Sequence, residues 1–392
     1  MENLQFKKIA IVCDWLIVCG GAEKVLFEII NCFPHAHLFA VIDFVDSKDR
    51  WFLHHKSVNT SFMQKIPFIK KHYRKFLSLM PYAIEQFDLS SYDIVISSSH
   101  AVAKGVITGP NQLHICYCHS PMRYAWDLQH QYLEESGLNK SILGLIARYQ
   151  LHKMRIWDYR TAAGVDHFIA NSKFVSKRIK KIYHRHCDII YPPVTIITKQ
   201  QIPNLSINQE YYLVVSRLVP YKKIVIIAET FSNKPALQLI IIGDGPEQSK
   251  IAKIANNTKN ITMLGKVDDE DLLQSYFLNA KAFINIAEED FGIATVEAQY
   301  YGLPVIGYAK GGSKEIIKCY SIGHDINEND TGILCPQQSV ESLSSAIDKF
   351  EAQKNKISAT NCQLNAEQYK STCFRDKIIT TVAKLVADHT NE

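Results

Sequence analysis

The alternation of short apolar runs with helical patterns limits the fold of this chain more than any other feature of the sequence. Lys8–Asp14 is an almost continuous apolar run, Gly20-Gly21 follows as a turn, and Ala22–Cys32 carries apolar residues at helical spacing. Apolar runs of this kind indicate strands that are buried on both faces of a parallel sheet. The first half continues in the same way, with strand patterns at Asp93–Ser97, His114–Cys118 and His167–Ala170 and a helical pattern at Ile142–Ala162. It therefore predicts a parallel α/β sheet.

The alternation stops near the middle of the chain and then begins again. Tyr191-Pro192-Pro193 and residues 203–208 have no periodicity, which indicates a linker. Strand patterns then recur at Tyr211–Ser216, Leu237–Ile242, Ile261–Leu264, Ala282–Ile286 and Val305–Tyr308. We expect two doubly wound α/β domains, residues 1–200 and 201–366, and then a last segment, 367–392, that forms a helix after a polar gap at Gln353–Asn361. Ligands of such sheets bind outside the carboxyl ends of the strands, so we expect the site in a cleft where two such edges face each other.

Length and composition exclude several classes of protein. The chain has 392 residues, 47% of them hydrophobic and 21% charged, which excludes collagenous, coiled-coil and disordered chains. A net charge of +5 is too small to predict nucleic-acid binding. The ten cysteines lie mostly in apolar runs without C-x-x-C spacing, which is typical of reduced thiols. No apolar run approaches the ~20 residues of a membrane span, so we expect a cytoplasmic protein whose membrane contact is peripheral.

Two glutamates follow the strand pattern at Ala282–Ile286. Glu289 lies in the loop after this strand, a helix is expected to begin at Phe291 or Gly292, and Glu297 lies inside it. A helix start offers free amides to a phosphate, and a carboxylate suits paired sugar hydroxyls. The spacing therefore fits a nucleotide sugar, although an ordinary acidic helix start explains it equally well.

A basic loop follows the first strand of the second half. Ser216 and Arg217 end this strand pattern, and Lys222 lies five residues further on. Arg217 and Lys222 can neutralise a departing diphosphate without a metal, but taken alone they fit a solvated basic loop better. Gly20-Gly21 and Gly243 mark tight turns after other strands. The full G-x-G-x-x-G fingerprint is absent, so a nicotinamide cofactor is not expected.

Histidine and aromatic residues follow the strand pattern at His114–Cys118. His119, Arg123, Tyr124 and Trp126 lie within eight residues. Aromatic faces stack on sugar rings and histidine can donate to a sugar hydroxyl, yet a lone histidine is more often structural. No metal is expected from the cysteines and histidines, because their spacing does not fit zinc. Asp269-Glu270-Asp271 fits a helix start better than a metal site.

The stretch Phe62–Tyr82 is basic and apolar. It carries Lys65, Lys70, Lys71, Arg74 and Lys75 among apolar residues and contains no acid. Such a stretch suits an anionic bilayer or a lipid diphosphate, and a solvated helix face explains it about as well.

Taken together, these motifs resemble those of the family 4 glycosyltransferases of the GT-B fold. The resemblance rests on five motifs in family order: Ser216–Lys222, Ile242–Glu247, Glu289–Glu297, Gly302–Val305 and Gly311–Glu315. In the first half, Asp14-Trp15-Leu16, Gly20–Glu23 and His119–Trp126 are similar to segments of bacterial mannosyltransferases of O-antigen and exopolysaccharide synthesis.

The resemblance implies a role for each candidate residue. Glu289 would contact the transferred sugar, Glu297 the ribose, and Arg217 and Lys222 the donor diphosphate. Gly21 would approach the diphosphate, and His119 would approach the sugar. The resemblance thus implies a retaining, metal-independent transferase whose catalytic residues are His119, Glu289, Arg217 and Lys222. Further donor contacts are implied for Gly20, Ser216, Gly243, Lys266, Val267, Phe291, Gly292, Ile293 and Ala294, and acceptor or sugar contacts for Arg123, Tyr124 and Trp126. The segment Ile316–Thr331 departs from the family pattern, and the last helix would cross back to the first domain.

The resulting expectation is transfer of mannose from GDP-mannose to a lipid-linked saccharide at the inner face of the membrane. The alternatives are a UDP-sugar-dependent transferase, a non-catalytic partner that only binds nucleotide sugars, a nucleotide-sugar epimerase, and a synthase with a soluble acceptor. Both glutamates and both cations are present, which argues against loss of catalysis.

Overall fold

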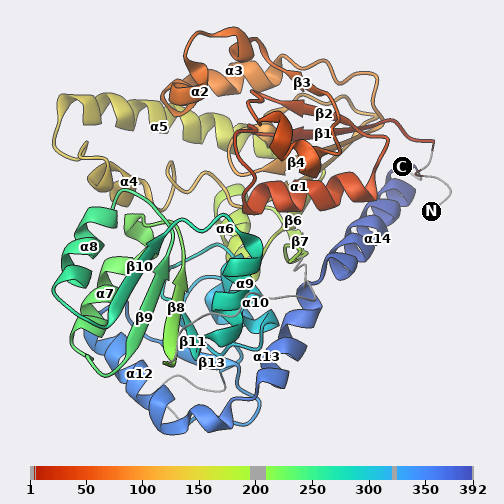
Figure 1. Ribbon diagram of the computed structural model, residues 1–392. Coiled ribbons are helices and arrows are strands. Elements are labelled where there is room, and N and C mark those ends of the chain that lie inside the picture. The colour runs from red at the N-terminus through yellow and green to blue at the C-terminus, as the bar shows by residue number, and fades with distance from the viewer. Residues whose placement is uncertain (1–3, 5, 195–208, 320–324, 391–392) are drawn as a thin grey trace. The chain divides into compact units, whose positions relative to one another are not determined.

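The structure, a computed structural model, describes residues 4, 6–194, 209–319 and 325–390, and the chain divides into two compact units (Figure 1). Unit 1 comprises Met1–Pro193 and Ser371–Glu392, and unit 2 comprises Val194–Lys370. The expected linker residues 203–208, and residues 320–324 of the segment that departs from the family pattern, lie outside the described residues.

Unit 1 is built on a seven-stranded, wholly parallel sheet in the order β3-β2-β1-β4-β5-β6-β7. The strands are β1 (Ile9–Cys13), β2 (His37–Ala40), β3 (Val58–Thr60), β4 (Ile94–Ser99), β5 (Leu113–Cys118), β6 (His167–Ala170) and β7 (Cys187–Ile189). The helices are α1 (Gly21–Cys32), α2 (Ile69–His72), α3 (Met80–Glu85), α4 (Gln129–Glu135), α5 (Ile142–Thr161), α6 (Lys173–Tyr183) and α14 (Ser371–Thr390). Shorter 3-10 helices lie at Ser47–Leu53, Phe62–Lys65, Tyr73–Leu79, Ala103–Gly105 and Ala162–Gly164.

The two faces of this sheet carry separate cores, because successive side chains of a strand point to opposite faces. Ile9, Ile11 and Cys13 of β1 pack on one face, against α1 and α14. Ala10 and Val12 pack on the other, against residues of α3 and α5. All five residues of β1 are buried, as its continuous apolar sequence predicts.

Unit 2 has a six-stranded parallel sheet in the order β10-β9-β8-β11-β12-β13. Its strands are β8 (Tyr211–Val215), β9 (Gln238–Ile242), β10 (Ile261–Gly265), β11 (Ala282–Asn285), β12 (Val305–Tyr308) and β13 (Gly332–Cys335). Its helices are α7 (Ile224–Ser232), α8 (Gln248–Asn256), α9 (Glu270–Asn279), α10 (Ile293–Tyr300), α11 (Ser313–Ile316), α12 (Val340–Gln353) and α13 (Ala359–Ala366), with 3-10 helices at Pro220–Lys222, Lys354–Lys356 and Glu367–Tyr369. The prediction of two parallel α/β sheets is confirmed.

Several elements differ from expectation. The supposed polar gap at 353–361 is not a gap, since it holds a 3-10 helix and the first turn of α13. The last helix begins at Ser371, after the 3-10 helix Glu367–Tyr369, and packs on α1 through Phe374, Ile378, Val382 and Val386.

Asp269 caps α9 by accepting hydrogen bonds from the amides of Asp271 and Leu272, which confirms the helix-start interpretation of these acids.

Candidate functional site

In unit 2, the loops that carry the predicted residues meet at one edge of the sheet. From β8 the chain steps outward through β9 and β10, and it then returns to the other side of β8 to form β11. The direction of winding therefore changes between β8 and β11, the position at which open α/β sheets bind ligands. The loop after β8 carries Arg217 and Lys222, and the loop after β11 carries Glu289.

Lys222 and Glu289 form an ion pair across this position. The Lys222 ammonium donates to Oε1 of Glu289, and the side chains are 18% and 11% exposed. The ammonium also lies 5.5 Å from the centre of the Tyr221 ring. A partly desolvated pair is held more strongly than a surface pair, so the two side chains hold each other in place.

Glycines allow the Glu289 loop to lie against the start of α10. Gly292 caps this helix with φ +107°, and a Cβ there would lie 3.1 Å from Oε2 of Glu289. The amide of Gly312 donates to the Glu289 carbonyl at 2.8 Å. A Cβ on Gly312 would lie only 1.9 Å from the Phe291 carbonyl oxygen. The Glu289 carboxylate therefore lies at the amino end of α10, where the helix dipole favours negative charge.

A second pair of glycines brings the β8 and β9 loops together. Gly243 has φ +137°, and a Cβ there would lie 1.8 Å from the Ser216 carbonyl oxygen. Its amide donates to the Gly265 carbonyl at 2.7 Å, which joins the β9 and β10 loops as well. Beyond Gly265, Lys266 pairs with Asp268 at 2.5 Å. The three loops thus form one continuous edge.

The remaining predicted donor residues lie around this edge in different settings. Arg217 is exposed on the β8 loop, and Val267 packs against the core of unit 2. Phe291 is buried and stacks edge-on against Tyr369, with ring centres 5.5 Å apart. Ile293 and Ala294 form the first turn of α10, and the partly buried Glu297 lies on the next turn. The structure brings Lys222, Glu289 and Gly292 together, whereas the others lie on the neighbouring loops and on α10.

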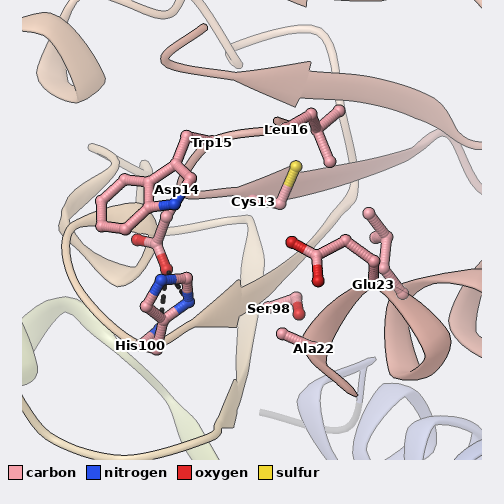
Figure 2. Close-up of a pocket in the computed structure, with 9 residues that line it drawn as sticks. Cys13, Asp14, Trp15, Leu16, Ala22, Glu23, Ser98 and His100 are labelled. Atoms are coloured by element: carbon pink, nitrogen blue, oxygen red, sulfur yellow. Dashed lines mark hydrogen bonds and ion pairs between the residues drawn. The ribbon is translucent and has the colours of Figure 1, made fainter. Parts of the chain in front are cut away.

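Unit 1 gathers polar residues at the corresponding edge of its own sheet. β1, β4 and β5 are neighbours there, and the residues that directly follow them are Asp14, His100 and His119 respectively. Figure 2 shows Asp14 against His100, near Trp15 and Glu23, in a small pocket that Cys13, Leu16, Ala22, Leu26 and Ser98 also line. Winding changes direction between β1 and β4, so this pocket also lies at a switch point.

Asp14 organises this pocket. Its buried carboxylate accepts hydrogen bonds from four consecutive amides, those of residues 100–103, at 2.5–3.1 Å. It also pairs with Nδ1 of His100 at 2.8 Å. Burial by itself raises the pKa of Asp14, but the charge and hydrogen bonds of His100 outweigh it and lower that pKa below its usual value. Asp14 thus fixes the loop after β4 as well as the His100 ring.

His100 of the pocket and the neighbouring His119, whose ring centres lie 6.3 Å apart, differ in charge. Burial favours neutral His100, yet the charge and hydrogen bond of Asp14 raise the pKa of His100 above its usual value. Burial, aided by the charge of His100, lowers the pKa of His119 to about 3. Nε2 of His119 lies 2.8 Å from the Ser98 hydroxyl. His119 is therefore neutral at physiological pH, and it suits hydrogen bonding to a hydroxyl better than binding to a phosphate.

Gly20 and Gly21 lie at the start of α1. The Gly20 amide donates to Oε2 of Glu23 at 3.0 Å, an arrangement that ties the glutamate back onto the turn. Burial raises the pKa of Glu23. The glycine turn and its glutamate thus bring a helix start to the wall of the pocket.

Arg123, Tyr124 and Trp126, the residues predicted for acceptor or sugar contacts, lie in different surroundings. Trp126 donates through its indole to Asp158 at 2.7 Å, and Asp158 is buried and paired with Lys104 at 2.7 Å. This indole thus helps to satisfy a buried charge pair. The hydroxyl of Tyr124 is buried and has no hydrogen-bond partner among the described residues. Arg123, the residue before Tyr124, is partly buried.

Sequence reasoning gave no role to His100, Lys104 or Asp158. His100 directly follows a strand end, and this position is itself a signal in a parallel sheet. Lys104 and Asp158 lie 54 residues apart and meet only through packing, so no local pattern reveals them. Within the described part of the chain, no group of three or more histidine, cysteine or acidic side chains is arranged to hold a metal ion.

Comparison with known families identifies the chain. Residues 19–196 match the family described as Glycosyltransferase Family 4, and residues 196–369 match Glycosyl transferases group 1. The chain belongs to the family 4 glycosyltransferases. The family predicted from the motifs and the GT-B fold are both confirmed.

Individual relatives are distant. A GDP-mannose-dependent monoacylated alpha-(1-6)-phosphatidylinositol monomannoside mannosyltransferase of Corynebacterium glutamicum is 30% identical over 26% of this chain and 30% of its own length. The O-antigen biosynthesis glycosyltransferase WbnH of Escherichia coli is 26% identical over 80% of this chain and 85% of its own. The match spans less than half of the length of three curated relatives. It covers 30% of the Corynebacterium protein and 41% and 26% of two others.

The fold is shared with solved transferases. Anabaena HepE in complex with UDP and glucose aligns with a TM-score of 0.66 and 19% identity, covering 96% of this chain and 99% of that one. No described helix has the length and apolar character to cross a membrane.

Proposed function

We propose that this transferase moves mannose from GDP-mannose to a lipid-linked saccharide in the synthesis of a surface polysaccharide. The Corynebacterium relative, whose name specifies GDP-mannose and a lipid-linked mannoside, supports the donor and the type of acceptor. The Escherichia coli relative, which matches over most of both chains, supports the surface polysaccharide.

The observation that carries the proposal is the Lys222–Glu289 pair at the switch point of unit 2. In the proposed reaction Lys222 and the exposed Arg217 hold the diphosphate, and Glu289 accepts hydrogen bonds from the sugar hydroxyls. Glu297 holds the ribose. The acceptor oxygen forms its bond to the anomeric carbon on the face from which the diphosphate leaves, which retains the configuration, and the acceptor proton passes to the departing diphosphate oxygen.

No metal is required in this proposal. As the diphosphate departs, Lys222 and Arg217 stabilise its charge in the role that a divalent ion has elsewhere. Neutral His119 of unit 1 donates a hydrogen bond to a sugar hydroxyl, and Gly21 allows the backbone to approach the diphosphate closely.

The segment Phe62–Tyr82 provides the proposed contact with an anionic membrane. The cationic side chains of Lys65, Lys70, Lys71, Arg74 and Lys75 are all exposed, and so are the rings of Phe62, Phe68 and Tyr82. Basic groups next to exposed rings suit a surface of anionic lipid headgroups.

Calorimetry with GDP, UDP and ADP in the presence of EDTA tests the donor. We expect GDP alone to bind tightly, and Lys222→Ala to weaken that binding at least tenfold. Lys253→Ala, an exposed lysine on α8, is the matched control and should bind GDP as the wild type does. A preference for UDP would replace mannose by a UDP-linked sugar. Binding of none of the three would favour the non-catalytic partner, and a reversible change of the donor without acceptor would favour the epimerase.

A further inference from the structure

Helix α5 carries an unusual share of the exposed apolar surface. Of the 17 large hydrophobic side chains that are exposed among the described residues, seven lie on this one helix of 20 residues. They are Ile142, Leu143, Leu145, Ile146, Tyr149, Ile156 and Tyr159, and Ile142 is 80% exposed. Scattered exposed apolar residues are ordinary, but a concentration of this kind marks a surface that meets something apolar.

Most of these residues form one stripe along the helix. At 3.6 residues per turn, positions 142, 145, 146, 149, 153, 156 and 160 fall within a sector of about 100°. The stripe is therefore Ile142, Leu145, Ile146, Tyr149, Lys153, Ile156 and Arg160, and we call it the α5 stripe. Its first four positions are apolar or aromatic, and the cations come later, with Lys153 lying over the Tyr149 ring at 5.2 Å.

The opposite face of α5 is firmly anchored, so the stripe is a fixed surface. Met154 and Asp158 are buried, and Trp157 donates to Glu85 of α3 at 2.7 Å. The helix start is capped by Ser141, whose hydroxyl accepts from the Gly144 amide at 3.1 Å. A Cβ on Gly144 would lie 1.8 Å from the Leu138 carbonyl oxygen, so the preceding loop packs directly on the helix.

The charge around the stripe is positive. Besides Lys153, α5 carries Arg148 and Arg155, whereas Arg160 pairs with Glu85 of α3. The one acid of α5, Asp158, is buried against Lys104. The neighbouring stretch Phe62–Tyr82 packs on the same face of the sheet as α5, through the core that contains Met63, Met80 and Met154. That stretch adds five exposed cations and no acid.

We propose that α5 lies in the headgroup region of an anionic bilayer, with Ile142, Leu145, Ile146 and Tyr149 inserted toward the acyl chains. Lysine and arginine then reach the lipid phosphates while their alkyl stems cover apolar surface. Tyrosine is favoured at this depth because its ring is apolar and its hydroxyl is polar. A second copy of the chain is a poorer occupant, because two such basic faces repel each other.

This inference rests on the proposed membrane contact, and it assigns the apolar part of that contact to α5. The stretch Phe62–Tyr82 then supplies mainly long-range attraction, which salt screens, and the α5 stripe supplies insertion, which salt leaves intact. The two contributions are therefore separable.

The test is flotation of the full chain with vesicles of phosphatidylcholine, with and without phosphatidylglycerol. We expect binding to the mixed vesicles, and at least tenfold weaker partition for the triple variant Leu145→Gln, Ile146→Gln, Tyr149→Gln. The matched control is Ile107→Gln, Leu278→Gln, Leu364→Gln, three exposed apolar positions outside α5, which should float as the wild type does. GDP calorimetry on the same samples reports separately on donor binding.

Each outcome of these experiments supports or overturns the insertion of α5 into the bilayer. Wild-type flotation of the α5 variant overturns the proposal, and so does a failure of the wild type to float. If Lys70→Gln, Lys71→Gln, Arg74→Gln and Lys75→Gln together abolish flotation while the α5 variant floats normally, the membrane contact stands but α5 has no part in it. A wild-type dimer that the α5 variant dissociates, with flotation unchanged, assigns the stripe to a second copy. Loss of GDP binding in every sample contradicts the donor proposal and leaves the α5 proposal standing.

Discussion

At the scale of single residues, the ion pair of Lys222 and Glu289 is the feature on which the chemistry depends most. Each side chain is mostly buried, so removal of one leaves the other with an uncompensated charge. We expect Lys222→Ala and Glu289→Ala each to lower the rate of transfer at least about 100-fold, as loss of one transition-state contact does. The far-ultraviolet circular dichroism of both variants should be unchanged.

The affinity for GDP distinguishes the role of Lys222 from that of Glu289. Lys222→Ala should weaken GDP binding, whereas Glu289→Ala should leave it unchanged or strengthen it, because the freed ammonium turns to the diphosphate. Lys253→Ala again serves as control. Near-wild-type transfer by both variants would show that neither residue has the role assigned here.

Gly292 is the glycine whose substitution we expect to matter most. Its φ of +107° disfavours any side chain, and a Cβ would press on the Glu289 carboxylate. Gly292→Ala should cost about 1–3 kcal/mol of stability and lower transfer more than tenfold. Gly164→Ala is the control, since a Cβ there meets nothing within 4 Å. Equal thermal midpoints for the two variants would contradict the argument.

Asp14 gives a prediction about pH. Its lowered pKa contributes stability that is present above about pH 4 and lost as the pH falls further. The raised pKa of His100 contributes stability that is present below about pH 6.5 and lost as the pH rises through that raised value. Asp14→Asn removes both contributions to stability. The variant should therefore lose about 1–3 kcal/mol of stability, and the loss should be largest between about pH 4 and pH 6.5.

Thermal midpoints at about pH 3.5, 5.5 and 8 check this prediction. Asp348→Asn, which removes the exposed carboxylate that pairs with Lys234, should change little at any of them. A difference between wild type and Asp14→Asn that does not vary with pH would mean that the carboxylate acts only through its shape.

At the scale of elements, the sequence predicts what continuous patterns encode. The strand at His167–Ala170 has the predicted limits, and α5 ends one residue before its expected end, because uninterrupted apolar or helical periodicity defines both. The short edge strands β3 and β7 escape prediction, since three residues with half-buried side chains carry no period. α13 escapes as well, because half of its sequence, Ala359–Ala366, is polar.

The packing of α14 on α1 is testable in the same terms. Phe374 is buried between these helices and lies edge-on to Tyr117, with ring centres 5.8 Å apart. Phe374→Ala should destabilise unit 1 by about 3–5 kcal/mol through the cavity it leaves. Thr372→Ala, exposed on the same helix, is the control. Unchanged thermal unfolding of the Phe374 variant would mean that α14 contributes nothing to this unit.

At the scale of the whole molecule, the candidate residues were predictable one by one, but their partners were not. Glu289 and Lys222 each follow a strand, so their edge of the sheet is predicted by topology alone. Their pairing spans 67 residues and depends on β8 and β11 being neighbours, which the order of strands in the sequence does not state. The same holds for Asp14 and His100, whose contact follows from the neighbouring β1 and β4.

The reaction proposed for this chain is transfer of mannose without a metal. Its most direct test is to incubate the protein with radiolabelled GDP-mannose, a lipid extract containing lipid-linked saccharides, and excess EDTA, and to follow label in the organic phase. We predict label in the lipid fraction at a rate that EDTA does not change and that Lys222→Ala reduces at least about 100-fold. Label that stays in the nucleotide fraction for the wild type, or transfer that EDTA stops, would contradict the account.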